Sequence, residues 1–524
     1  MLIQNFKKLQ QKDLSFFYAY ELDAEDHLKC VFRSDGIAKN NYSMFGDLLS
    51  FDTTYNTNKY AMIFAPFTGL NHHRFSITFG AALLANEKTE SFSWLFKKFL
   101  ECMGGNEPVL IVTDQDPAMR SALEKTFKTA KHRFCMWHIM KKLSEKVGGC
   151  LNANSVFQRR FKTCVWNSES PIEFETNWNA IISDFELSKN DWLLHMFETR
   201  KMWIPVYLQD IPLSGLLRTT SRSESENSFF GNFMNNKLGL IEFYSRYDNA
   251  MEAQRQKELK AEHDTLNGKP YLKTSLAIEK FASSLYTHKN FYLFQDELWA
   301  SCIGCGVKRA QELSDSCIFT IIDSGNPNDK YREVIYSSSN ITCSCKMFET
   351  QGIPCRHILL VLKGQEINEL PSYCITTRWT KLATSNPIFQ INSKLFAECS
   401  ESERRRKLIS STWTQLSRCM ELAKYKDETL IDLRNCAVNW ENQMRANYDC
   451  DEIDSNFASL DESQIPDKIE IFPPQYSKTK GSGKRMKSGK EKSIEIKQKT
   501  SRLCRNCGEQ ALHGSRNCPK KSTL

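Results

Sequence analysis

The stretch VLIVTDQD at residues 109–116 decides the fold class, because it joins a run of apolar residues to carboxylates. Its first four residues predict a short buried strand, and Asp114 stands at the end of that strand. A second carboxylate, Asp52, lies in the segment SFDTTY at residues 50–55. This segment belongs to the first strand of the same predicted unit, so we expect the two carboxylates to come from two strands of one sheet.

The neighbouring elements follow an alternating order. Three consecutive strands are predicted at residues 48–55, 60–67 and 76–84. A helix capped by Ser91 comes next. The strand at 109–112 is followed by a helix at 117–127 and by a last strand at 133–137. The order β-β-β-α-β-α-β predicts an α/β fold with an RNase H-like mixed sheet over residues 47–138.

The carboxylates predict a metal-dependent acidic site. In strand-transferring enzymes of this fold, carboxylates from separate elements hold two divalent cations about 4 Å apart, and hard oxygen ligands favour Mg²⁺. Asp52 and Asp114 fill the first two positions, with Asp116 as the alternative for the second. Glu224 is the candidate for the third, with Glu226 as its alternative. A single aspartate at a strand end is more often a turn or capping residue, so the prediction depends on the joint pattern.

Cysteine spacing predicts zinc sites. The chain has 19 cysteines and its first residues lack the long apolar core of a secretory signal, so we expect a reducing compartment in which clustered cysteines bind metal. The strongest pattern is C-x-C-x9-C-x-H, formed by Cys343, Cys345, Cys355 and His357. Three thiolates and one imidazole close a tetrahedral zinc site with no open position, which indicates a structural role. Four unrelated buried residues are the weaker alternative.

A second module is expected near the end of the chain. Cys504, Cys507, His513 and Cys518 have the pattern of a zinc knuckle with one extra residue between the second cysteine and the histidine. Such a knuckle binds nucleic acid or, alternatively, protein.

Two further pairs are less specific. Cys302 and Cys305 lack a partner pair at zinc-finger distance and are predicted to be structural. Cys135 and His138 supply half a zinc site, so we favour structural hydrogen bonding over metal or DNA contact.

Composition divides the rest of the chain. The expected units are a hairpin segment (1–46), the sheet domain (47–138), a helical insertion with the remainder of the core (139–290), a zinc-finger region (317–370), a helical segment (400–447), a disordered basic linker (448–503) and the knuckle (504–519). The helical segment is expected to pack within the chain, with a dimer helix as the alternative. No apolar run is long enough to span a membrane.

Basic residues of the linker suggest a nucleic-acid contact. Lys484, Arg485 and Lys487 form a nuclear-import or phosphate-binding patch, unless they are only part of a solvated linker. The net charge of +8 weakly favours polyanionic partners.

Six segments carry a family resemblance. They are residues 45–60, 64–67, 71–73, 113–116, 132–139 and 222–225. Together they closely resemble the Mutator-like transposase domain of the plant far-red-impaired-response family, over about residues 6–370. The C-x-C-x9-C-x-H pattern resembles a SWIM zinc finger and lies where that family carries one. The resemblance implies a helical insertion at 139–215, between the second and third acidic positions.

The resemblance implies a nuclear, DNA-associated transcription regulator that descends from a transposase and is not an enzyme. Zn²⁺ is the expected cofactor, Mg²⁺ would join it if the acidic site is used, and a homo- or heterodimer with related members is an expected partner. An active transposase using Asp52, Asp114 and Glu224 and a zinc-dependent protein adaptor are the alternatives. Family members usually carry an N-terminal zinc-binding DNA-recognition domain, whereas no Cys/His cluster precedes the hairpin, so sequence-specific DNA binding is not carried over.

Overall fold

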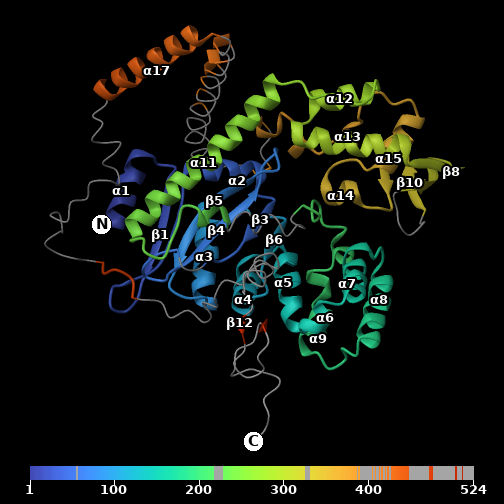
Figure 1. Cartoon of the computed structure of the whole chain (residues 1–524), viewed down its shortest axis with the longest axis horizontal. Coiled ribbons are helices and arrows are strands. Elements are labelled where there is room, and N and C mark those ends of the chain that lie inside the picture. Colours follow the sequence, from blue (N-terminus) through green and yellow to red (C-terminus); the bar gives the residue numbers. More distant parts are fainter. Residues whose placement is uncertain are drawn as a thin grey trace, which may run out of the picture. The chain divides into compact units, whose positions relative to one another are not determined.

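The computed structural model describes most of the chain (Figure 1). The described residues are 1–54, 57–216, 228–324, 331–385, 388–389, 426–447, 471–475, 502–503 and 510–511, with isolated positions between 404 and 423. Residues 1–478 form one unit and residues 479–524 a second. In the second unit, β12 (Arg502–Leu503) pairs antiparallel with β13 (Gln510–Ala511).

A seven-stranded mixed sheet organises the first unit, in the order β1-β2-β5-β4-β3-β6-β7. Its strands are β1 (Phe17–Leu22), β2 (Leu28–Ser34), β3 (Leu48–Phe51), β4 (Ile63–Leu70), β5 (Ser76–Leu84), β6 (Leu110–Thr113) and β7 (Lys131–Phe134). β3, β6 and β7 are parallel, whereas the other pairs are antiparallel. The N-terminal hairpin β1–β2 forms one edge of this sheet, because β2 pairs with β5.

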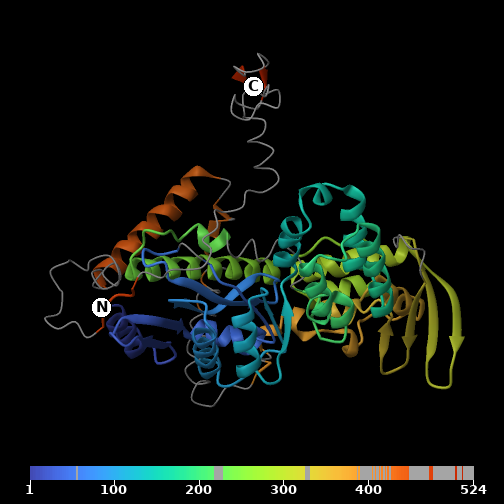
Figure 2. The same ribbon diagram turned by 90° about the horizontal axis from the view of Figure 1, so that it is seen from below.

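Helices cover both faces of the sheet because side chains alternate along its strands. Phe32 and Phe67 point into a core built with α2 (Gly36–Phe45), α3 (Thr89–Cys102) and α4 (Pro117–Thr126). Val31 and Phe64 point to the other face, against α1 (Leu2–Lys12) and α11 (Leu240–Asn267). Figure 2 shows α11 running along the sheet.

The segment after β7 is helical and has its own core. Its elements are α5 (Met136–Lys146), α6 (Gly149–Asn152), α7 (Ser155–Asn167), α8 (Pro171–Asp184), α9 (Asp191–Glu198), η1 (Arg200–Met202) and η2 (Pro205–Leu208). The side chains of Asn154, Ser170 and Asn190 cap the starts of α7, α8 and α9. Trp178 and Trp203 lie in the buried centre of this helical group.

A separate antiparallel sheet lies near the zinc-finger pattern, in the order β11-β10-β9-β8. Its strands are β8 (Cys305–Glu312), β9 (Cys317–Asp323), β10 (Arg332–Tyr336) and β11 (Ile341–Cys343). The helices of this region are α12 (Ala277–Leu285), α13 (His288–Ile303), α14 (Met347–Gln351) and α15 (Arg356–Gly364). Phe319, Ile321 and Val334 pack on residues of α13 and α15 in one core. The chain continues through η3 (Ser372–Cys374), η4 (Thr377–Trp379) and η5 (Ala383–Ser385) to α17 (Asp427–Asn447).

None of the helices that the structure describes is both long and apolar enough to cross a membrane.

Candidate metal centre and acidic site

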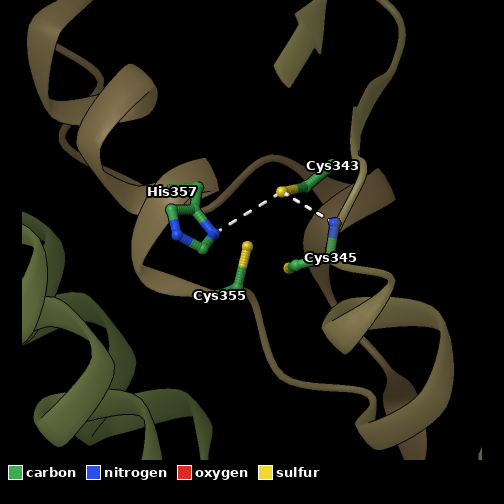
Figure 3. Close-up of side chains that lie close together, drawn as sticks. All are labelled: Cys343, Cys345, Cys355 and His357. Carbon is green, nitrogen blue, oxygen red and sulfur yellow. Dashed lines mark hydrogen bonds between the residues drawn. The ribbon is translucent and has the colours of Figure 1, made fainter. Parts of the chain in front are cut away.

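The four residues of the C-x-C-x9-C-x-H pattern converge on one point (Figure 3). Cys343 ends β11, and Cys345 follows in the turn to α14. Cys355 is the N-cap of α15 and His357 lies in the first turn of that helix. The ligand atoms of all four residues lie within 4.8 Å of one another. Cys343, Cys355 and His357 are buried, and Cys345 is half-buried.

The geometry of this cluster fits zinc. Sγ of Cys343 lies 3.6 Å from Nδ1 of His357. A tetrahedral ion with ordinary Zn–S and Zn–N bonds separates these two ligand atoms by about 3.6 Å as well. Burial raises the pKa of the Cys355 thiol, whereas hydrogen bonds from Cys343 and Cys355 lower the pKa of Cys345. Three thiols and one imidazole at this spacing are therefore suited to a closed structural zinc site.

Two carboxylates that the sequence did not single out surround this cluster. Nε2 of His357 lies 3.2 Å from Oδ2 of Asp323 at the end of β9, so the imidazole presents Nδ1 to the three thiols. Arg356 binds Glu297 of α13 through its backbone N at 2.9 Å, Nε at 3.0 Å and Nη2 at 2.9 Å. Asp323 fixes the ring of His357, and Glu297 anchors the start of α15. Neither has a local signal, because each acts on a residue far along the chain.

We expect Asp323→Asn to weaken zinc binding by about 10- to 100-fold, because metal-bound histidines depend on an acceptor for their second ring nitrogen. The measurement is competition for zinc between the purified chain and a chelator of known affinity. Glu333→Gln is the matched control, because Glu333 is exposed on the adjacent strand β10. Equal affinity of Asp323→Asn and the control would contradict the positioning role of Asp323.

Asp52 and Asp114 lie at the same end of the large sheet. β3 and β6 are parallel, and Ser50 pairs with Val112. Asp52 and Asp114 each stand two residues further along the chain, so both lie at the same end of the sheet. Oδ2 of Asp52 lies 3.7 Å from Nε2 of His138, which α5 supplies. The structure thus places His138 beside Asp52 and Asp114, which are two of the three predicted acidic positions.

The electrostatics of the acidic site favour the binding of a proton or a cation by Asp114. Burial raises the pKa of Asp114 to about 6, and the nearby Asp52 adds to this rise. The backbone N–H of Asp116, 3.0 Å from Oδ1 of Asp114, opposes it, as do His138 and Lys142. A buried carboxylate whose charge is opposed by a second carboxylate marks a site where a cation would relieve repulsion.

We expect Asp114→Asn to stabilise the fold at pH 7 by up to about 2 kcal/mol, measured by urea unfolding in a chelator. The folded-state pKa of Asp114 is raised, so the wild type loses stability as pH rises from about 4 to about 6, and the neutral amide does not. The gain should vanish near pH 4. Asp116→Asn is the control, because Asp116 caps α4 through Met119 N and asparagine caps as well. A loss of stability in Asp114→Asn at pH 7 would contradict this account.

Of the other predicted site residues, the structure describes some, and the rest lie outside the described part of the chain. Asp116 caps α4, and Cys135 hydrogen-bonds His138, which is the structural bonding that the sequence favoured for that pair. Cys302 is exposed and lies 3.6 Å from Nζ of Lys363, whereas Cys305 lies near Asp323 and His357. Predicted residues outside the described part of the chain are Glu224, Glu226, Lys484, Arg485, Lys487, Cys504, Cys507, His513 and Cys518.

Two family models match the chain. The MULE transposase domain matches residues 48–142, which contain Asp52, Asp114 and His138. The SWIM zinc finger matches residues 326–363, which contain all four ligands of the cluster, so zinc is the implied cofactor.

Proteins of Arabidopsis thaliana are similar to the chain along part of their length. "Protein FAR1-RELATED SEQUENCE 5" is 38% identical over 392 residues, which are 74% of this chain and 49% of that protein. "Protein FAR-RED IMPAIRED RESPONSE 1" is 34% identical over 385 residues, 74% of this chain and 46% of that protein. "Protein FAR1-RELATED SEQUENCE 9" is 34% identical over 385 residues, 73% of this chain and 69% of that protein. The chain thus spans about half the length of the first two relatives.

Proposed function

The chain belongs to the FAR1-related family of transposase-derived regulators, and from this premise we propose that it is a zinc-dependent, DNA-associated transcription regulator of the nucleus. The closed Cys343–Cys345–Cys355–His357 site carries this proposal. A metal with four protein ligands has no position for a reacting group, so its role is to hold a surface in shape. That surface lies in the same chain as a MULE transposase domain, whose ancestral substrate is DNA.

The large sheet supports an RNase H-like fold as part of the same proposal. Its antiparallel strands β5, β4 and β3 continue into the parallel strands β6 and β7, with helices on both faces. The two aspartates stand at the carboxyl ends of β3 and β6, where this fold places its carboxylates. His138 and Lys142 lie beside them and would contact a phosphate backbone.

The test measures DNA binding by three purified proteins and the occupancy of chromatin by the same three, through chromatin immunoprecipitation. They are the wild type, Asp52→Asn and Cys355→Ser. We expect the wild type and Asp52→Asn to bind duplex DNA with an affinity that falls steeply with salt, and to occupy chromatin alike. Cys355→Ser should lose occupancy. Failure of the wild type to bind DNA at any salt below physiological would instead support a protein adaptor.

The paired aspartates favour one second function, a metal-dependent strand transferase. Parallel pairing of β3 with β6 brings Asp52 and Asp114 to one end of the sheet, where burial and then the charge of Asp52 raise the pKa of Asp114. Mg²⁺ would bind there through carboxylate oxygens. Strand cleavage that requires Mg²⁺ or Mn²⁺ and disappears in Asp52→Asn would establish this activity and overturn a purely regulatory role.

A further inference from the structure

Two histidines and a glutamate meet at the opposite end of the large sheet from the acidic site. The turn between β4 and β5 carries His72 and His73, and α11 contributes Glu262. Nε2 of His72 and Nε2 of His73 lie 2.9 and 2.8 Å from the same atom, Oε2 of Glu262. β4 runs antiparallel to β3, so this turn lies where β3 begins, whereas Asp52 follows the end of β3.

The turn is held rigidly from two sides. Oδ1 of Asn71 accepts a hydrogen bond of 3.0 Å from the backbone N of His73. From the side of α13, Thr287 Oγ1 and Asn290 Nδ2 donate to the backbone oxygen of His72 at 2.8 and 2.7 Å. All five side chains are buried. The two imidazoles are therefore positioned before any ligand arrives, which lowers the cost of binding.

We propose that His72, His73 and Glu262 bind a divalent transition-metal cation. Two imidazoles and one carboxylate are a donor set that Zn²⁺ and neighbouring first-row cations accept. Ligand atoms about 2.1 Å from one ion at right angles are about 3 Å apart, which matches the 2.8 and 2.9 Å separations. The side chain of Glu262 is 21% exposed, so water reaches the remaining coordination positions.

The neighbourhood of the proposed ligands is acidic, which suits a cation. Glu258, one helical turn before Glu262 on α11, adds a second buried carboxylate, and Asn71 Nδ2 holds it at 3.0 Å. The bound cation ties the β4–β5 turn to α11, as a structural link that is independent of the proposed function.

The test is the zinc content of the full chain, measured by mass spectrometry after zinc loading and dialysis. Glu262→Gln keeps the size and one acceptor oxygen, and it should hold one zinc per chain fewer than the wild type. His73→Asn should show the same loss. Asp264→Asn, an exposed carboxylate on the same helix, should match the wild type. Unchanged zinc content in folded Glu262→Gln would overturn the proposal and leave a hydrogen-bonded cluster.

Cobalt loading of the wild type covers the case in which the variants do not fold. Cobalt at thiolate sites absorbs strongly through charge transfer, whereas cobalt held by nitrogen and oxygen does not. We expect cobalt beyond the amount that the thiolate absorption accounts for. A cobalt content fully explained by thiolate sites would overturn the proposal.

Discussion

Cys355→Ser should abolish zinc binding at the SWIM finger and lower the free energy of unfolding of the surrounding region by about 4 kcal/mol or more, since the loss of a structural metal is among the largest single-residue effects. The serine hydroxyl can still cap α15, where Sγ of Cys355 now accepts from the N–H of Ile358 at 3.5 Å. The expected loss therefore comes from the missing thiolate ligand and not from the cap.

The loss of stability in Cys355→Ser should extend beyond the four ligand residues. Cys343 and Cys355 belong to the same buried core as Ile321, Val334 and Leu298, which joins the small sheet to α13 and α15. Loss of the metal removes the link between the end of β11 and the start of α15. We therefore expect amide hydrogen exchange to rise across β9, β10, β11 and α15, while β2 and β5 of the large sheet, whose buried side chains belong to other cores, stay protected.

A chelator and a second cysteine make this experiment decisive. Zinc removal should raise amide exchange of β9, β10, β11 and α15 in the wild type to the level seen in Cys355→Ser, and leave exchange of these elements in the variant unchanged. Cys374→Ser changes a buried thiol outside the cluster, so it measures the cost of burying a hydroxyl alone. A wild type that is insensitive to chelation, or a Cys374→Ser variant as unstable as Cys355→Ser, would contradict a structural zinc site.

Local patterns predicted the architecture where a single segment contains the signal. Apolar runs predicted the elements from β3 to β7 in their order, and the spacing of four residues predicted the thiol–imidazole cluster. The predicted cap of α3 was wrong: the helix begins at Thr89 after Lys88, and Ser91 lies in its first turn, where its hydroxyl donates to Asn86. Bounds shifted where the pattern was ambiguous: β4 spans Ile63–Leu70 instead of 60–67. β8 (Cys305–Glu312) was not predicted, because nearly all of its residues are exposed and its apolar residues do not alternate with polar ones.

Contacts between distant segments could not be predicted. Asp323 and Glu297 act on His357 and Arg356 only after β9, α13 and α15 have packed together. The sequence indicated His73 only as part of a segment that resembles the family and predicted no site for it. Its partner Glu262 is far along the chain, in a long helix with many charged residues. Such pairs depend on tertiary packing, which residue spacing does not encode.

Arg378 joins the segment after the zinc finger to the large sheet. It is buried, and its guanidinium donates to the carboxylate of Asp47 through Nη1 and to the backbone oxygen of Leu70 through Nη2. Asp47 immediately precedes β3, and its backbone oxygen accepts from Val109 and Leu110 at the start of β6. One ion pair between a buried arginine and a half-buried aspartate thus links a residue beyond the SWIM finger to the strands that carry the acidic site.

Arg378→Met should cost about 3 kcal/mol of unfolding free energy at pH 7, because it leaves the half-buried carboxylate of Asp47 without its counter-charge. Burial already raises the pKa of Asp47 even with Arg378 beside it, so without the guanidinium the carboxyl should take up a proton more readily. A raised folded-state pKa means that the deficit is present at neutral pH and shrinks as pH falls. Urea unfolding at pH 5 and pH 7 measures this difference, with the exposed Arg309→Met as control. The double variant Asp47→Asn, Arg378→Met should recover part of the loss, since no buried charge remains. A deficit independent of pH, or no recovery in the double variant, would mean that Arg378 contributes packing and backbone hydrogen bonds instead of charge.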